Sequence, residues 1–234
     1  MNDEVKYHIG FVMYPGMTQL DLTGPHQVFA LFPNTAIHLI WKSLEAVTSS
    51  EGLKILPSTT FDDCPQLDVI SVPGSGMAQA EIMEDEQVLG FLQSQAKNAK
   101  YITSVCTGSM ILAAAGLLQG YRAACHWLFR DYLKMLGVEV STERVVIDRN
   151  RITGGGVTAG IDFALVIAAQ LYDEDTAKRL QLILEYNPAP PFNTGSPETA
   201  GTALVEKIKQ SAEKLLSTNL AVTKRVSKRL SLSS

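Results

Sequence analysis

Short apolar runs separated by turn signals mark the first half of the chain. Near-continuous apolar stretches are typical of strands that are buried on both faces of a sheet. On this basis we predict β-strands over residues 7–14, 37–41, 68–73 and 101–105. The first run ends at Pro15-Gly16 and the third at Gly74-Ser75-Gly76, and both sequences favour turns.

Apolar residues at helical spacing lie between and after these runs. We predict helices over residues 86–99, 109–115, 127–136, 158–171, 176–184 and about 199–216. Because strands and helices alternate, the sequence predicts an α/β fold with a mostly parallel central sheet and helices on both faces.

The end of the chain departs from this alternation. The segment 186–197 contains four prolines, which exclude a central strand or a helix interior, so we expect an ordered arm on the surface. We place a single domain at residues 1–221 and expect a weakly ordered, basic C-terminal tail over residues 222–234.

Composition narrows the class of protein. The 234 residues are 46% hydrophobic and 19% charged, which is an ordinary globular balance, and the net charge of -4 offers no basic field for nucleic acid. No apolar run approaches the ~20 residues that cross a membrane. The three cysteines form no CxxC pair, so we expect neither a disulfide framework nor a metal site, and the cytoplasm is the expected compartment.

Cys106 is the strongest candidate for chemistry. A predicted strand ends at Val105 and a helix begins near Gly108, which is the strand–turn–helix context of a nucleophile elbow. A helix N-terminus favours a thiolate, and the N–H of Thr107 and the Gly74-Ser75 loop are candidate donors to an anionic intermediate. The alternative is that Cys106 is a small buried hydrophobe, as we expect for Cys64 and Cys125.

Asp21 is the candidate acid partner. It lies between two leucines after the first strand, where burial would raise its pKa and let it hold a proton. The alternative is a cap or turn role at the helix that starts near Pro25.

Other candidates are weaker. His26 and Trp127 are candidate substrate-binding residues, together with Gly74 and Ser75, whereas His126 is expected to be structural. The glycine run that starts at Thr153 is expected to give close backbone packing beside the elbow.

The motifs LTGPH, PGSG, TSVCTGS, TGGG and LEYNPAPPFNTGSP together resemble the ThiJ/PfpI superfamily (class I glutamine amidotransferase-like), and within it the isocyanide (isonitrile) hydratases. The resemblance implies a flavodoxin-like three-layer sandwich and a homodimer. It also implies Cys106 as nucleophile, Asp21 as the nearby acid, and backbone donors from Thr107 and Gly74-Ser75. Thr107 stands where many superfamily members carry His, which disfavours a peptidase, and Ser75 stands where glycine is common.

The function implied by the resemblance is cysteine-dependent hydration of isocyanides to N-substituted formamides through a thioimidate, without cofactor or metal. One alternative is a ligand sensor related to the sensing domain of AraC-like regulators, although only about eighteen residues follow Leu216, too few for their DNA-binding domain. Another is a stress-response role through oxidation of Cys106.

Overall fold

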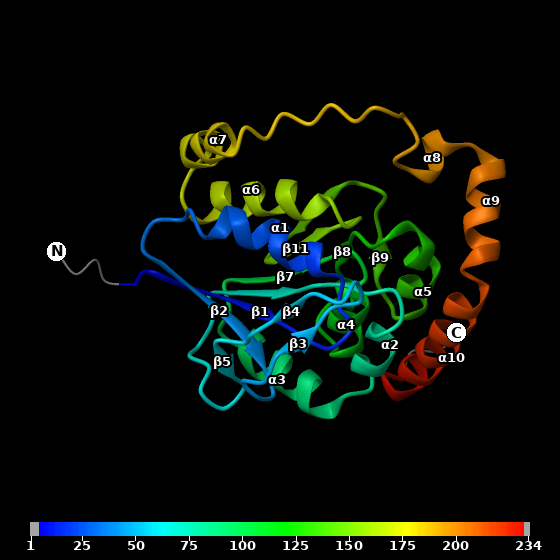
Figure 1. Ribbon diagram of the computed structural model, residues 1–234. Helices are drawn as coiled ribbons and strands as arrows, with labels where there is room; N and C mark the ends of the chain where they lie inside the picture. The colour runs from blue at the N-terminus through cyan, green and yellow to red at the C-terminus, as the bar shows by residue number, and fades with distance from the viewer. Residues whose placement is uncertain (1–4, 232–234) are drawn as a thin grey trace.

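A seven-stranded sheet in the order β10-β11-β7-β6-β1-β2-β5 forms the centre of the computed structural model, which describes residues 5–231 (Figure 1). Its strands are β1 (Tyr7–Val12), β2 (Thr35–Trp41), β5 (Thr59–Thr60), β6 (Val69–Val72), β7 (Tyr101–Val105), β10 (Val145–Asp148) and β11 (Arg151–Gly154). Within this seven-stranded sheet β10 pairs antiparallel with β11, and the other strand pairs are parallel. Two small sheets pair β3 (Val47–Thr48) with β4 (Lys54–Ile55), and β8 (Arg122–Ala123) with β9 (Glu139–Val140).

Helices cover both faces of this sheet, as the alternating pattern predicted (Figure 1). One layer contains α1 (Gln19–Phe29), α6 (Ala159–Leu171) and α7 (Glu174–Ile183). The opposite layer contains α2 (Gln79–Ile82), α3 (Glu86–Ala96), α4 (Gly108–Ala114), the short 3-10 helix Trp127–Phe129 and α5 (Arg130–Met135). The last helices are α8 (Pro197–Ala200), α9 (Thr202–Ser211) and α10 (Glu213–Arg229). The three-layer sandwich is therefore confirmed.

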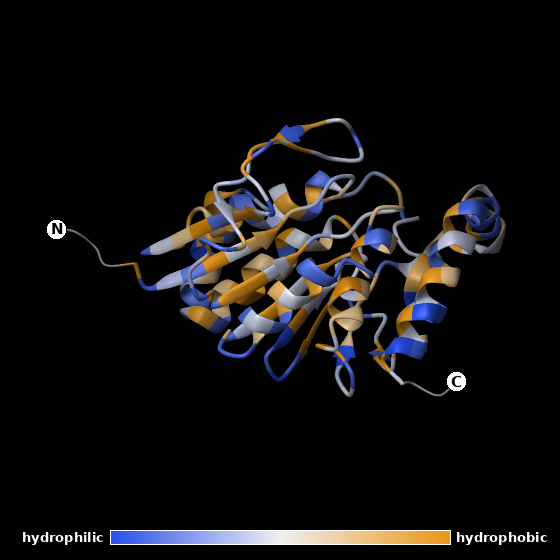
Figure 2. Cartoon of the chain, turned by 90° about the horizontal axis from the view of Figure 1, so that it is seen from below, coloured by the Kyte–Doolittle hydropathy of each residue, from blue (hydrophilic) through white to orange (hydrophobic). Residues whose placement is uncertain are grey.

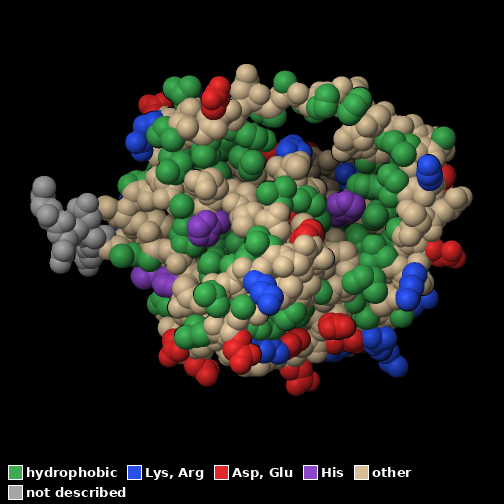
Figure 3. Space-filling view, viewed as in Figure 1, with side chains coloured by type: hydrophobic (Ala, Val, Ile, Leu, Met, Phe, Trp, Pro, Cys, Tyr) green, Lys and Arg blue, Asp and Glu red, His purple; other side chains and the backbone are tan. Residues whose placement is uncertain are grey.

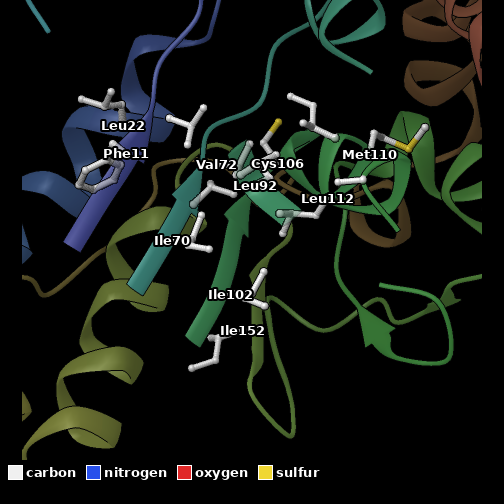
Figure 4. Close-up of a cluster of buried hydrophobic side chains, with 14 of the residues drawn as sticks. Phe11, Leu22, Ile70, Val72, Leu92, Ile102, Cys106, Met110, Leu112 and Ile152 are labelled. Atoms are coloured by element: carbon white, nitrogen blue, oxygen red, sulfur yellow. The ribbon is translucent and has the colours of Figure 1, made fainter. Parts of the chain in front are cut away.

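The core follows from the apolar runs. The four residues of β6 are all buried, and hydrophobic colour runs along the central strands in Figure 2. Figure 4 shows Ile70, Ile102 and Ile152 projecting from three adjacent strands, which bury them between the sheet and the helices. Burying apolar surface on both sides of the sheet supplies the main driving force for this fold.

The bounds of two strands differ from expectation, and β2 begins at Thr35 rather than Ile37. The first strand ends at Val12 rather than Tyr14, and Met13 and Tyr14 continue as buried, non-strand residues. The chain has to leave the sheet there, because Gly16 takes a left-handed φ of 77°.

The weakly ordered tail expected from Val222 is wrong for the residues that the structure describes. Helix α10 continues to Arg229, with Val222 and Val226 buried. Arg225 pairs with Glu84 through two hydrogen bonds of 2.7 and 2.6 Å. The two valines are four positions apart and therefore lie on one face of the helix. The basic residues around them made this apolar face hard to recognise in the sequence. Residues 232–234 lie outside the described part of the chain.

The proline-rich arm spans the gap between α7 and α8 (Figure 1). Residues 187–195 are all exposed, so the arm stretches over the body instead of packing closely on it. Among residues 5–231, no helix combines the length and apolar character needed to cross a membrane.

Candidate active site

Three neighbouring strands deliver the candidate residues to one edge of the sheet. Asp21 follows β1, Gly74 follows β6 and Cys106 follows β7, and β6 lies between the other two strands. Numbered along the chain, the parallel strands β1, β2, β6, β7 and β11 lie in the sheet in the order 2-1-3-4-5. The chain therefore passes from β1 to β2 on one side of β1, and β6 then lies on the other side. Ligands of open α/β sheets bind at such a switch point, at the carboxyl ends of the strands.

Cys106 occupies a strained turn between β7 and α4. Its φ is 59°, in the left-handed region that non-glycine residues rarely adopt. A Cβ on Gly108 would lie 2.0 Å from the carbonyl oxygen of Val72, so only glycine allows the helix to start this close to β6. Figure 4 shows Cys106 beyond the end of β7, near Val72. The geometry of a nucleophile elbow is therefore present.

The glycine run supports this turn from the neighbouring strand. Gly154 pairs in register with Val105, and its carbonyl oxygen accepts the Cys106 N–H at 3.0 Å. The expectation of close backbone packing beside the elbow is confirmed.

Asp21 lies inside α1 and is fully buried against the elbow. Its Oδ2 accepts the Gly74 N–H at 2.8 Å. Oδ1 is also buried and receives no hydrogen bond of standard geometry from the described residues, while the Cys106 thiol lies close enough to shift the pKa of the carboxyl. The N-cap of α1 is Thr18, so the alternative in which Asp21 caps the helix is wrong.

Burial controls the protonation of this pair. It raises the pKa of Asp21 to about 7, although the hydrogen bond from the Gly74 N–H and the nearby Cys106 thiol oppose the shift. Burial also raises the pKa of Cys106, which is only 5% exposed, and the negative charge of Asp21 adds to the increase. The Thr107 N–H acts in the opposite direction. The N–H at the helix N-terminus therefore favours the thiolate, as the sequence predicted, but burial outweighs it.

Thr107 joins the elbow to the loop after β6. Its hydroxyl accepts the Ser75 N–H at 2.8 Å and donates to the Ser75 carbonyl at 2.7 Å. A Cβ on Gly74 would lie 2.5 Å from the Thr107 nitrogen. The Gly74 and Ser75 N–H groups are thus engaged by Asp21 and Thr107, so they are not the open anion donors that we expected. The Thr107 N–H remains directed at the sulfur.

Sequence reasoning missed Tyr14. This residue is fully buried, and its hydroxyl donates to the Pro73 carbonyl at 2.9 Å. The charges of Asp21 and Cys106 help to raise the pKa of its phenol, after burial itself, so the ring lies near the pair. In the sequence, the position of Tyr14 just after a strand could have indicated a place near the site, but an ordinary core residue has the same position.

A cavity of about 400 Å³ lies beside the elbow. Its wall includes Cys125, Trp127 and Gly155, which directly follows the hydrogen-bond partner of Cys106, but neither Cys106 nor Asp21 is part of that wall. Trp127 therefore lines a cavity, as its assignment to substrate binding requires. His26 instead packs its ring near Phe11, at 6.0 Å, and no described interaction connects it with Cys106 or Asp21.

The remaining histidine and cysteines have structural surroundings. The Nδ1 of His126 accepts the Leu128 N–H at 3.4 Å, and burial lowers the pKa of the ring to about 4, which keeps it neutral. Cys125 hydrogen-bonds Ser109, and burial raises the pKa of its thiol to about 12. Burial likewise raises the pKa of Cys64 to about 11. Neither cysteine has the left-handed backbone of Cys106 or its position between a central strand and a helix.

Comparison with known proteins extends this picture. The model of the DJ-1/PfpI family matches residues 8–170. The chain is 54% identical over 224 residues to the isonitrile hydratase of Pseudomonas putida, covering 96% of this chain and 98% of that enzyme. It is 34% identical to the HTH-type transcriptional regulator GbdR of Pseudomonas aeruginosa, but over 60% of this chain and 38% of the regulator.

Solved structures agree with the fold. A ThiJ/PfpI family protein from Pseudomonas syringae superposes with a TM-score of 0.91 at 43% identity, covering 94% of this chain and 91% of the other. Drosophila melanogaster DJ-1beta superposes with a TM-score of 0.70 at 22% identity, which supports the fold alone. The flavodoxin-like sandwich expected from the sequence is confirmed.

Proposed function

Because the chain belongs to the DJ-1/PfpI family, we propose that it is an isocyanide hydratase, a hydro-lyase that converts isocyanides to N-substituted formamides. The likeness to the isonitrile hydratase extends over almost the whole chain. The burial of the Asp21 carboxyl next to the elbow that holds Cys106 is the structural observation that carries the proposal. It supports a chemistry that needs one nucleophile and one proton donor, and we assign these roles to Cys106 and Asp21.

The first step follows from the protonation of the pair. Above about pH 7 the two acids together lose one proton, because the pKa of Asp21 is about 7 and that of Cys106 is higher. When the remaining proton resides on Asp21, Cys106 is a thiolate that receives the Thr107 N–H. The sulfur attacks the terminal carbon of R–N≡C and the Asp21 proton transfers to that carbon, which gives the thioimidate R–N=CH–S–Cys106.

The second step releases the product. Asp21, now a carboxylate, takes a proton from water as the water oxygen adds to the thioimidate carbon. That proton passes to the nitrogen, the C–S bond breaks, and R–NH–CHO leaves. The proton of the new hydroxyl returns to the pair, so water is the only co-reactant consumed.

We also propose that two copies associate through the edge beside this site. The loop that joins β3 to β4 lies against the start of α1, since the Ser50 N–H donates to the Met17 carbonyl at 3.0 Å. Leu20, Leu53 and Leu56 are 37%, 48% and 68% exposed there. An apolar edge of this kind suits a homodimer interface. Sedimentation of the wild type as a monomer at micromolar concentration would contradict this assembly.

We place the protein in the cytoplasm. All three cysteines are free thiols, and Cys106 could not act as a nucleophile if it were held in a disulfide.

A ligand-sensing role is the second candidate, supported by the likeness to a transcriptional regulator. A sensor would bind an isocyanide or its product without turnover. A measurement of formamide production therefore separates the two candidates.

The test is steady-state turnover of an aryl and an alkyl isocyanide, with formamide measured by chromatography. We expect Cys106→Ala to abolish turnover and Asp21→Asn to reduce it by about 100-fold or more. Cys64→Ala is the matched control, because Cys64 lies outside the site, and it should retain wild-type rates. Wild-type protein that forms no formamide, or Cys106→Ala that still turns over, would refute the proposal.

A further inference from the structure

The cavity beside the elbow is larger than the reacting group of an isocyanide needs. The isocyano group has two non-hydrogen atoms, whereas the cavity has a volume of about 400 Å³. The wall of the cavity contains Cys125 and Gly155, which flank the elbow, and also Gly195 and Ser196 at the end of the arm. In Figure 3 the surface is hollowed below the arm, and basic side chains are visible within this hollow. The additional volume is available for the R group of the substrate.

Arg130 is the group in this wall with unused hydrogen-bonding capacity. Its Nη1 donates to Glu198 on α8 at 3.1 Å, while its Nε is buried and has no partner among the described residues. Nε and Nη2 form one edge of the guanidinium, and none of the contacts of Arg130 uses that edge. A buried donor without a partner is costly, so a site that keeps one is built to receive an acceptor.

The other charged groups of the wall already have partners. Arg144 donates through Nε to Asp162 at 2.8 Å and through Nη2 to Thr158. Glu143 accepts from Arg122 at 2.7 Å. The neutral ring of His126 adds no charge. Arg130 also has an ionic partner, Glu198, but its Nε–Nη2 edge is free, so this edge is the part of the wall that favours an anionic acceptor.

The position of Arg130 relates this preference to the reaction. Arg130 lines the same cavity as Cys125 and Gly155, which flank the elbow, and its positive charge lowers the pKa of both His126 and Cys125. A planar guanidinium edge matches the two oxygens of a carboxylate. A molecule with a carboxylate at one end and an isocyano group at the other could be bound by Arg130 while its terminal carbon approaches Cys106.

We propose that Arg130 is a specificity-determining residue that binds the carboxylate of an isocyano acid, so that the preferred substrates are isocyanides whose R group carries a carboxylate. This inference rests on the proposed function. The products are N-formyl amino acids or their longer homologues. A neutral isocyanide of the same size reaches the same thiol but lacks the anchor.

The test compares isocyanoacetate and 3-isocyanopropanoate with their methyl esters. For wild-type protein we expect a KM for the better carboxylate at least 10-fold below that of its ester. In Arg130→Gln we expect the KM for that carboxylate to rise about 10- to 100-fold, while kcat and the KM of the ester change less than threefold, because one charge-assisted pair has been lost. Arg130→Lys should give an intermediate KM, since it retains the charge without the fork.

Two controls separate binding from structure. Glu198→Gln removes the partner of Arg130 on α8 but keeps the guanidinium, so it should retain the preference for the carboxylate. Arg149→Gln removes an arginine that pairs with Asp148 away from the cavity and should behave as wild type. Equal KM values for carboxylate and ester in the wild type, or equal changes for both in Arg130→Gln, would overturn the inference.

A binding measurement distinguishes failure of this inference from failure of the proposed function. N-Formylglycine, the product expected from isocyanoacetate, can be titrated into wild-type and Arg130→Gln protein by calorimetry. Binding that depends on Arg130 supports the carboxylate site even if no isocyanide is hydrated. Turnover of the esters together with Arg130-independent binding refutes the carboxylate site and leaves the hydratase intact.

Discussion

The hydroxyl of Thr107 makes both hydrogen bonds that the Ser75 backbone can offer, at 2.8 Å from its N–H and at 2.7 Å to its carbonyl. The residue after the nucleophile thereby fastens the elbow to the loop after β6. That loop also holds Asp21, through the Gly74 N–H. Nucleophile, acid and loop consequently move as one unit, and the side chain of Thr107 is a positioning group whereas its N–H acts on the sulfur.

Replacing Thr107 by valine should disturb this unit. Thr107→Val keeps the shape but leaves the buried N–H and carbonyl of Ser75 without partners, at a cost of about 1–3 kcal/mol for each group. We expect a lower midpoint of urea unfolding and at least a 10-fold lower kcat. Thr107→Ser keeps the hydroxyl and should remain within a few-fold of wild type. A wild-type kcat in Thr107→Val would show that the positioning is unnecessary.

The rate should depend on pH through the carboxyl. At low pH both acids are protonated and no thiolate exists, so kcat/KM should rise with pH through an apparent pKa near 7, the value to which burial raises Asp21. Because the pKa of Cys106 is also raised, the fall at high pH should lie at or above the usual range for a thiol. Stopped-flow or steady-state profiles from pH 5 to 10 measure both limbs. A flat profile between pH 5 and 8 would contradict the assignment.

The same carboxyl should make stability depend on pH. The pKa of Asp21 is about 7 in the folded protein against 3.8 for an exposed carboxyl. Below pH 4 the carboxyl is protonated in both the folded and the unfolded protein, so it costs no stability. As the pH rises to about 7 the unfolded protein loses this proton while the folded protein keeps it, which lowers the free energy of unfolding by about 4 kcal/mol. Asp21→Asn cannot ionise, so its free energy of unfolding relative to wild type should increase between pH 5 and 8. Parallel stability curves for the two proteins would refute the buried, raised carboxyl.

The C-terminal helix should be part of the folded domain. Val226 is 1% exposed, so Val226→Asp would bury a charge and should destabilise the protein by several kcal/mol. The neighbouring residue Lys224 is exposed, and Lys224→Asp is the matched control. Thermal unfolding should show a large fall in Tm for the first variant and a small change for the second. Equal Tm values would indicate that α10 contributes nothing to the domain.

Local chemistry in the sequence was enough to predict much of this protein. The buried strands that end at Val72 and Val105 and the helix that starts at Gly108 follow from apolar runs and turn residues, because such signals act over a few positions. The position of Cys106 at a strand-to-helix turn follows in the same way. Asp21 could be proposed as a buried carboxyl because it lies between two leucines after the first strand, and the family resemblance supplied its pairing with Cys106.

Only the tertiary structure decided what those residues experience. The burial that raises the pKa of Cys106, the use of the Ser75 N–H by Thr107, and the nearness of Tyr14 all depend on contacts between segments that are distant in the chain. The order of Val222 and Val226 depends likewise on packing of α10 against the domain. Sequence patterns report short-range preferences, whereas desolvation and hydrogen-bond partners are set by which distant groups the fold brings together.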